Sequence, residues 1–165
     1  MKFWKKLPYG WKVCMAFVLF FISTLGFAHF RGKHTVPHLG VESLEPNPEI
    51  VESWEGKPKI LYFWANWCSV CKVYKPILDA NVSLIPSEIL FFSIREAEDG
   101  EEAGRSKWES EPDLYIADYN LLKEWEVGAY PTTVFVSGSG KILFSDTGII
   151  SPIGFFLRSF FMKLF

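Results

Sequence analysis

Two cysteines three positions apart, Cys68 and Cys71, are the residues of this sequence whose type and spacing best suit a chemical reaction. Two thiols at this spacing can close a small disulfide ring when a helix begins at the first of them. An apolar run at 59–64 precedes the pair, and 69–80 follows with a helical pattern. The pair is therefore expected where a buried strand gives way to a helix, with Cys68 facing solvent at the helix N-terminus and Cys71 one turn further along.

Cys68 is the cysteine expected to react first. A helix N-terminus places the positive end of the helix dipole and unpaired backbone N–H groups beside its sulfur, and both favour a thiolate there. Lys72 and Lys75 add positive charge nearby. The sequence thus predicts thiol-disulfide exchange, in which Cys68 attacks a partner sulfur and Cys71 resolves the mixed disulfide.

Several separate segments resemble the thioredoxin superfamily. They are the apolar run Lys59 to Trp64, the motif Trp67-Cys68-Ser69-Val70-Cys71, Pro76 in the following helix, and Tyr130-Pro131-Thr132. The resemblance covers residues 50–165 and implies an α/β thioredoxin-like fold, a central mixed sheet flanked by helices. Within the superfamily, Tyr62-Phe63-Trp64-Ala65 leading into this cysteine pair is most similar to the membrane-anchored periplasmic group typified by the suppressor-of-copper-sensitivity D protein, close to the TlpA, ResA and DsbE branches.

The resemblance implies roles for individual residues. Pro131 is expected to follow a cis bond and to lie against the cysteine pair, where the backbone before it can pair with an extended substrate. The dithiol itself carries the electrons, so neither a bound cofactor nor a metal is expected. One position departs from thioredoxin: Tyr62 stands where thioredoxin has a buried Asp, so proton transfer at Cys71 needs another group or water. The residues expected to support partner docking are Trp67, Ser69, Val70, Tyr130 and Pro131.

The N-terminal segment predicts an export signal. Lys2, Lys5, Lys6 and Lys12 precede an apolar run at 13–30, about the ~20 residues of a membrane-spanning helix. Positive charge on this side places 1–12 in the cytoplasm and makes 13–30 a transmembrane signal anchor in the bilayer. A Pro-containing linker at 31–49 then leads to the domain at 50–165, expected in the periplasm of a bacterium as a single-pass inner-membrane protein. The alternative is a cleaved signal peptide, for which Gly26-Phe27-Ala28 supplies small residues, and a soluble periplasmic enzyme.

The charge distribution and the number of histidines bear on two other functions, nucleic-acid binding and metal binding. All six basic residues before Val36 stand without an acid, whereas from Val36 onward 11 Lys and Arg face 19 Asp and Glu, 11 − 19 = −8, which disfavours nucleic-acid binding. The expected partners are protein thiols or disulfides in the periplasm and a membrane electron-transfer protein. The alternative function is a non-catalytic metal-handling (copper or zinc) or docking module. A zinc site needs about four ligands, and only His34 and His38 could join the two cysteines.

The remaining pattern predicts the other elements of the domain. The acidic segment 96–111 is expected to form a loop and an amphipathic helix around Ala103 and Trp108, and it either pads the domain or forms part of the partner-binding face. The apolar C-terminal run 155–165 is expected to pack on the sheet, with a membrane-surface or partner-docking helix as the alternative. Strands are expected at 89–94, 114–117, 132–136 and 141–145, the last two joined by a hairpin, and helices at 120–125 and from a Ser151 cap with Pro152 first.

Overall fold

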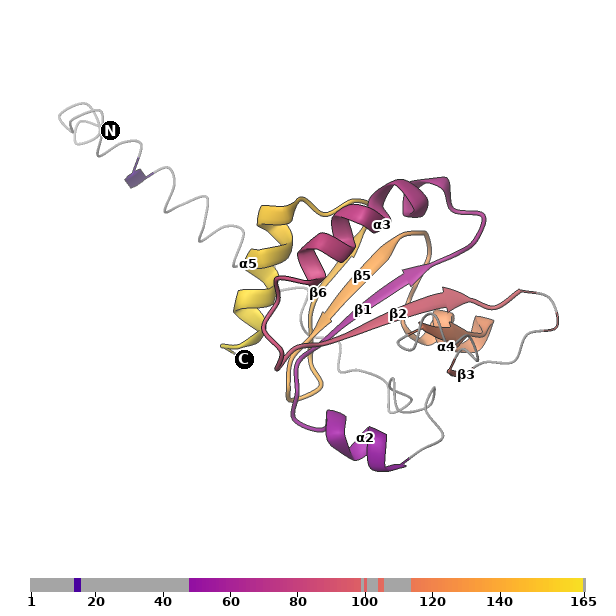
Figure 1. Cartoon of the computed structure of the whole chain (residues 1–165), viewed down its shortest axis with the longest axis horizontal. Coiled ribbons are helices and arrows are strands. Elements are labelled where there is room, and N and C mark those ends of the chain that lie inside the picture. The colour runs from indigo at the N-terminus through magenta and orange to yellow at the C-terminus, as the bar shows by residue number, and fades with distance from the viewer. Residues whose placement is uncertain (1–13, 16–47, 99, 101–103, 106–113, 165) are drawn as a thin grey trace, which may run out of the picture.

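The computed structural model describes residues 14–15, 48–98, 100, 104–105 and 114–164 (Figure 1). Its domain alternates strands and helices around one sheet, which confirms the α/β prediction. The elements in chain order are α2 (Pro48–Trp54), β1 (Lys59–Trp64), α3 (Ser69–Val82), β2 (Leu90–Glu96), β3 (Gly104–Arg105), β4 (Leu114–Ala117), α4 (Tyr119–Glu124), β5 (Thr132–Val136), β6 (Ile142–Thr147) and α5 (Pro152–Met162).

The sheet is mixed and has β1 near its centre. Its strand order is β3-β4-β2-β1-β5-β6, with β1 parallel to β2 and antiparallel to β5. Ile60 to Phe63 are all at most 1% exposed, since both faces of β1 are covered. This explains the continuous apolar run, which is typical of a strand buried on both sides.

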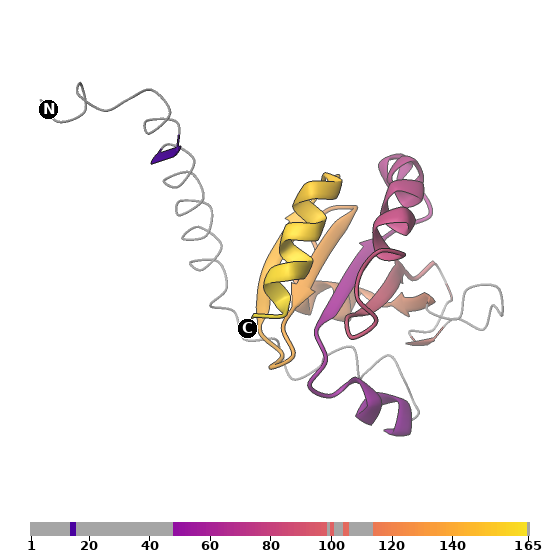
Figure 2. The ribbon, with the colours of Figure 1, turned by 60° about the vertical axis from the view of Figure 1, so that its left-hand side comes forward.

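Helices cover both faces of the sheet (Figures 1 and 2). On one face, α3 and α5 pack through Tyr74, Leu78 and Phe155 against Ile60 and Phe135. On the other face, α2 and α4 cover a second cluster. That second cluster includes Trp54, Phe63, Phe92, Leu121 and Trp125.

The helix that follows the cysteines is longer than predicted. It runs through Pro76 to Val82 rather than ending at Ala80, and the kink at Pro76 stays a prediction. The last helix begins as predicted, because Ser151 is its N-cap, with Oγ accepting from the Gly154 N–H, and Pro152 opens it.

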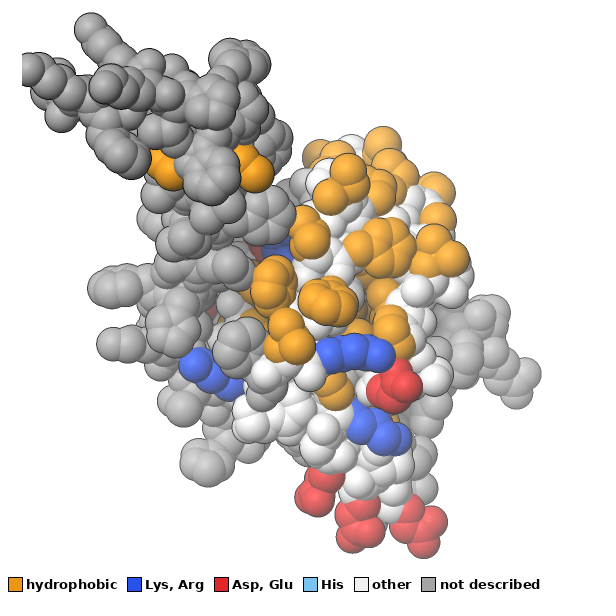
Figure 3. Space-filling model, turned by 90° about the vertical axis from the view of Figure 1, so that its left-hand side faces the viewer, with side chains coloured by type: hydrophobic (Ala, Val, Ile, Leu, Met, Phe, Trp, Pro, Cys, Tyr) orange, Lys and Arg blue, Asp and Glu red, His pale blue; other side chains and the backbone are white. Residues whose placement is uncertain are grey.

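The C-terminal run does pack on the sheet. Phe155 is fully buried and Met162 is 1% exposed, which confirms the packing prediction for α5. Ile153, Leu157 and Phe160 point the other way and are exposed, and apolar side chains gather on this side of the molecule (Figure 3). A docking role for that outer side stays a prediction.

One local prediction needs correction. A helix was expected around Ala103, but Gly104 and Arg105 form β3, which pairs antiparallel with Tyr115 and Ile116 of β4. Glycine disfavours a helix interior, and the outer edge of β4 offers unpaired backbone groups, so a short strand is the better local solution. The helix α2 spans the position at which the linker (31–49) is expected to meet the domain (50–165), and this boundary stays a prediction.

The predicted anchor at 13–30 and most of the predicted amphipathic segment lie outside the described residues. Of the anchor only Cys14 and Met15 are described, and both are helical. Within the described ranges, no helix has the length and hydropathy that crossing a bilayer requires.

Candidate active site

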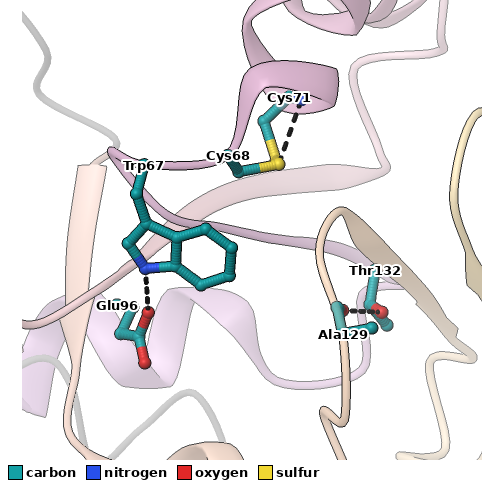
Figure 4. Close-up of a disulfide and its surroundings, with 6 residues drawn as sticks. All are labelled: Trp67, Cys68, Cys71, Glu96, Ala129 and Thr132. Carbon is teal, nitrogen blue, oxygen red and sulfur yellow. Dashed lines mark hydrogen bonds between the residues drawn. A yellow bond between two sulfur atoms is a disulfide. The ribbon is translucent and has the colours of Figure 1, made fainter.

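Cys68 and Cys71 form a disulfide at the start of α3, with Cα atoms 5.3 Å apart. Cys68 is the N-cap of the helix, with φ −76° and ψ 100°, and its Sγ accepts a hydrogen bond from the Cys71 N–H at 3.1 Å (Figure 4). A backbone donor aimed at Sγ stabilises negative charge on this sulfur when the disulfide is open. The geometry therefore supports the choice of Cys68 as the nucleophile.

Cys68 is less accessible than its predicted solvent-facing position suggested, and Cys71 is buried as well. Cys68 is 5% exposed and Cys71 is 2% exposed, because they form a small apolar cluster with Ala65 against which Trp64 and Tyr130 pack. Cys68 is still the more accessible of the two. Ser69 and Val70, between the two cysteines, are exposed and mark the open side of the cysteine turn.

The loop before β5 supplies the opposite wall of the site. The Tyr130–Pro131 bond is cis, as predicted, and Tyr130 packs against the cysteine cluster. The Thr132 hydroxyl donates to the Ala129 carbonyl oxygen at 2.7 Å and lies 3.0 Å from the Thr147 hydroxyl, which fixes the loop to β6 (Figure 4). Direct contact between Pro131 and the sulfurs stays a prediction.

Trp67 shields the site from the side of β2. Its side chain is 71% exposed, and its ring meets the Tyr130 ring edge-on with centroids 5.5 Å apart. The indole N–H donates to Glu96 Oε2 at 3.1 Å (Figure 4). The Tyr130 hydroxyl hydrogen-bonds the same carboxylate. Glu96 therefore fixes two rings that come from opposite sides of the disulfide.

Burial, followed by the charge of Glu96 and the hydrogen bond to its carboxylate, raises the pKa of Tyr130 to about 12. We expect the 295 nm titration of the folded chain to contain one phenolate that forms near pH 12 instead of pH 10 and is missing in Tyr130→Phe. Because the folded pKa lies above the unfolded value, the stabilisation by neutral Tyr130 is complete below pH 10 and is lost from pH 10 to about 12. A Tyr130→Phe difference curve centred at pH 10 would contradict the Glu96 contact.

Tyr62 cannot replace the thioredoxin Asp as a base. Its ring is 1% exposed, and burial, followed by the neighbouring Tyr74 and Asp79, raises its pKa far above the usual range of tyrosine. The phenol therefore keeps its proton at physiological pH, so proton transfer at Cys71 needs another group or water.

Sequence reasoning missed Glu96, which it placed only at the start of an acidic segment. The position of Glu96 follows from the register of the sheet, because β1 and β2 are parallel and Trp64 pairs with Arg95. The residue after Arg95 therefore lies beside the start of the cysteine turn. A second contact of this kind joins the Asn66 side-chain amide to the Glu98 carboxylate. Among the described residues, no group of three or more His, Cys, Asp or Glu side chains could hold a metal ion.

The chain belongs to the thioredoxin-like domain family, whose model matches residues 53–156. The fold and the Cys68–Cys71 disulfide together define a thiol-disulfide oxidoreductase. The chain is 27% identical to a thioredoxin-like protein of Haemophilus influenzae, over 100% of this chain and 99% of that one.

Two further relatives carry the name thiol:disulfide interchange protein. DsbE of Pseudomonas fluorescens biotype C is 29% identical over 59% of this chain and 56% of its own length. HelX of Rhodobacter capsulatus is 30% identical over 60% and 55%, so the chain spans about half the length of these two relatives.

Solved structures of low identity share the fold. MTB dsbF aligns with a TM-score of 0.53 at 19% identity and covers 67% of this chain and 84% of that one. The exposed lipoprotein thioredoxin Etrx1 of Streptococcus pneumoniae aligns with a TM-score of 0.53 at 20% identity and covers 70% and 90%.

Proposed function

We propose that this chain is a membrane-anchored enzyme that exchanges electrons with the thiols and disulfides of partner proteins in the periplasm. The observation that carries the proposal is the Cys68–Cys71 disulfide at the N-terminus of α3, facing the Tyr130–Pro131 loop. The resemblance of Tyr62-Phe63-Trp64-Ala65 to the suppressor-of-copper-sensitivity D group supports a place in that subgroup.

The two cysteines have different roles in this reaction. In the reducing direction, the Cys68 thiolate attacks one sulfur of a partner disulfide, the partner S–S bond breaks, and the other partner sulfur leaves as a thiolate. The Cys71 thiolate then attacks the Cys68 sulfur, which releases the second partner thiolate and closes the Cys68–Cys71 bond. Two electrons pass from the chain to the partner, and the oxidising direction is the reverse.

Single-turnover kinetics test this function. The reduced full chain, held in mild detergent, is mixed with a peptide disulfide, and thiols are counted in both reactants. We expect one peptide disulfide to be consumed for each Cys68–Cys71 disulfide formed. Tight stoichiometric binding of copper or zinc by the dithiol, without exchange, would instead support the metal-handling alternative.

The proposed anchor rests on the four lysines that precede the apolar run 13–30. We expect the chain to remain in salt-washed membranes at its unprocessed mass, because a spanning helix is held far more tightly than a surface contact. After mild reduction, an impermeant maleimide that reaches the periplasm should label Cys68 and not Cys14. A soluble protein that begins near His29 would show that the segment is a cleaved signal peptide.

A further inference from the structure

A cavity of about 490 Å³ opens beside the disulfide, between the end of β2, α4 and the loop before Pro131. Its lining includes the aromatic rings of Trp67, Tyr119 and Tyr130 and the apolar side chains of Leu122 and Val127. The Cys68 and Cys71 side chains are not among the lining residues, so the cavity is a separate space next to them.

Two residues belong to both the cavity and the sulfur site. Trp67 precedes Cys68 in the chain, and Tyr130 packs against the cysteine cluster while lining the cavity. An extended chain advances by about 3.3 Å per residue, so a partner whose cysteine reaches Cys68 has side chains within a few residues that reach the cavity. A side chain that fills the cavity would therefore belong to the same partner segment as the reacting cysteine.

The charge of the cavity favours a cation. Among the residues that the structure describes, two carboxylates line it, those of Glu96 and Glu126, against one exposed ammonium group, that of Lys123. The Trp67 N–H and the Tyr130 hydroxyl both hydrogen-bond the Glu96 carboxylate at the edge of the two rings. A carboxylate has about four acceptor positions, so two such bonds leave Glu96 room to accept from a further donor.

We propose that this cavity binds a lysine or arginine side chain that lies close to the reacting cysteine of the partner. The inference rests on the proposed exchange reaction and adds the class of partner to it. The cationic group pairs with Glu96, and its stem and charge lie against the rings of Trp67 and Tyr130. Arginine is favoured over lysine, because its planar group can stack on a ring and pair with a carboxylate at the same time.

Glu96 acts in this proposal as a positioning and specificity residue. Glu96→Gln keeps a side-chain oxygen that can accept from the Trp67 N–H, removes the negative charge and replaces the second oxygen with an NH2 group. Glu124→Gln is the matched control, since Glu124 lies on the same short helix as Lys123 and does not line the cavity. Lys123→Gln tests the opposite sign, because it removes the one positive charge that the described part of the chain contributes to the lining.

The test measures second-order rates of the reduced full chain, in mild detergent, with single-cysteine peptides. Each peptide is presented as a mixed disulfide with 2-mercaptoethanol and carries Arg, Lys, Gln or Glu one to three residues before or after its cysteine. Every rate is divided by the rate of the same peptide with dithiothreitol, which removes the effect of the substituted residue on the intrinsic reactivity of the peptide.

At one or more positions on one side of the cysteine, we expect the Arg peptide to react about fivefold faster than the Glu peptide, with the Gln peptide between them. The ratio should fall toward one in Glu96→Gln, rise in Lys123→Gln and stay unchanged in Glu124→Gln. Equal rates for the Arg, Gln and Glu peptides, or a ratio that survives Glu96→Gln, would overturn this inference while leaving the exchange reaction standing. If the chain reacted with none of the peptides, the proposed function itself would be overturned.

Discussion

Replacing Cys68 with serine is expected to lower the rate of exchange by a factor on the order of 10³ or more, because the nucleophilic sulfur is lost and Cys71 is nearly inaccessible at 2% exposure. Cys71→Ser should instead react once and stop. Its Cys68 thiolate still attacks, but no second thiolate is present to resolve the mixed disulfide.

Non-reducing electrophoresis and intact mass spectrometry separate the two variants. Cys71→Ser should carry one partner molecule on Cys68, and Cys68→Ser should carry none. Cys14→Ser is the control for the third cysteine, which lies outside the domain core and is exposed. Accumulation of adducts in Cys68→Ser, with none in Cys71→Ser, would reverse the two roles.

Phe135→Ala is expected to lower the free energy of unfolding by about 3–5 kcal/mol, the range found when a large buried ring is removed from a core. Phe135 is fully buried on β5, and its ring meets those of Phe144 and Phe155 with centroids 6.1 Å and 5.7 Å away. The cavity left behind would lie where α5 packs on β5, the strand that begins just after Pro131.

Urea unfolding of the full chain in mild detergent, followed by circular dichroism, measures this change. Phe160→Ala is the matched control, because the same ring is removed from a side chain that is 62% exposed on α5. The control should stay within about 0.5 kcal/mol of the wild type. Similar losses in both variants would mean that α5 does not pack as described.

Local patterns in the sequence predicted most of the elements because each carries its own signal. The apolar run Lys59 to Trp64 reports a strand covered on both faces, and the Ser151-Pro152 pair reports a helix start. The hairpin at 132–145 follows from two short apolar runs around a Gly-containing turn. For the Tyr130–Pro131 bond, only the resemblance to a known superfamily predicted the cis form, because local sequence favours trans.

Contacts between distant segments were not predictable in the same way. The bond from Trp67 to Glu96 depends on the register of β1 against β2, which brings together residues 29 positions apart. The low exposure of Cys68 depends on the packing of Tyr130, which lies far along the chain in the loop before β5. The short strand at Gly104 exists only because β4 offers an edge to pair with.

Cys68 and Cys71 are expected to form one reversible two-electron couple. Equilibrating the Cys14→Ser chain with graded ratios of oxidised and reduced dithiothreitol or glutathione, then alkylating the free thiols, measures it directly. We expect the Cys68 and Cys71 thiols to appear and disappear together in a single transition. In this transition, each tenfold change in the ratio of oxidised to reduced chain corresponds to about 30 mV. Two cysteines that titrate independently, or a pair that stays reduced at every poise of the buffer, would contradict it.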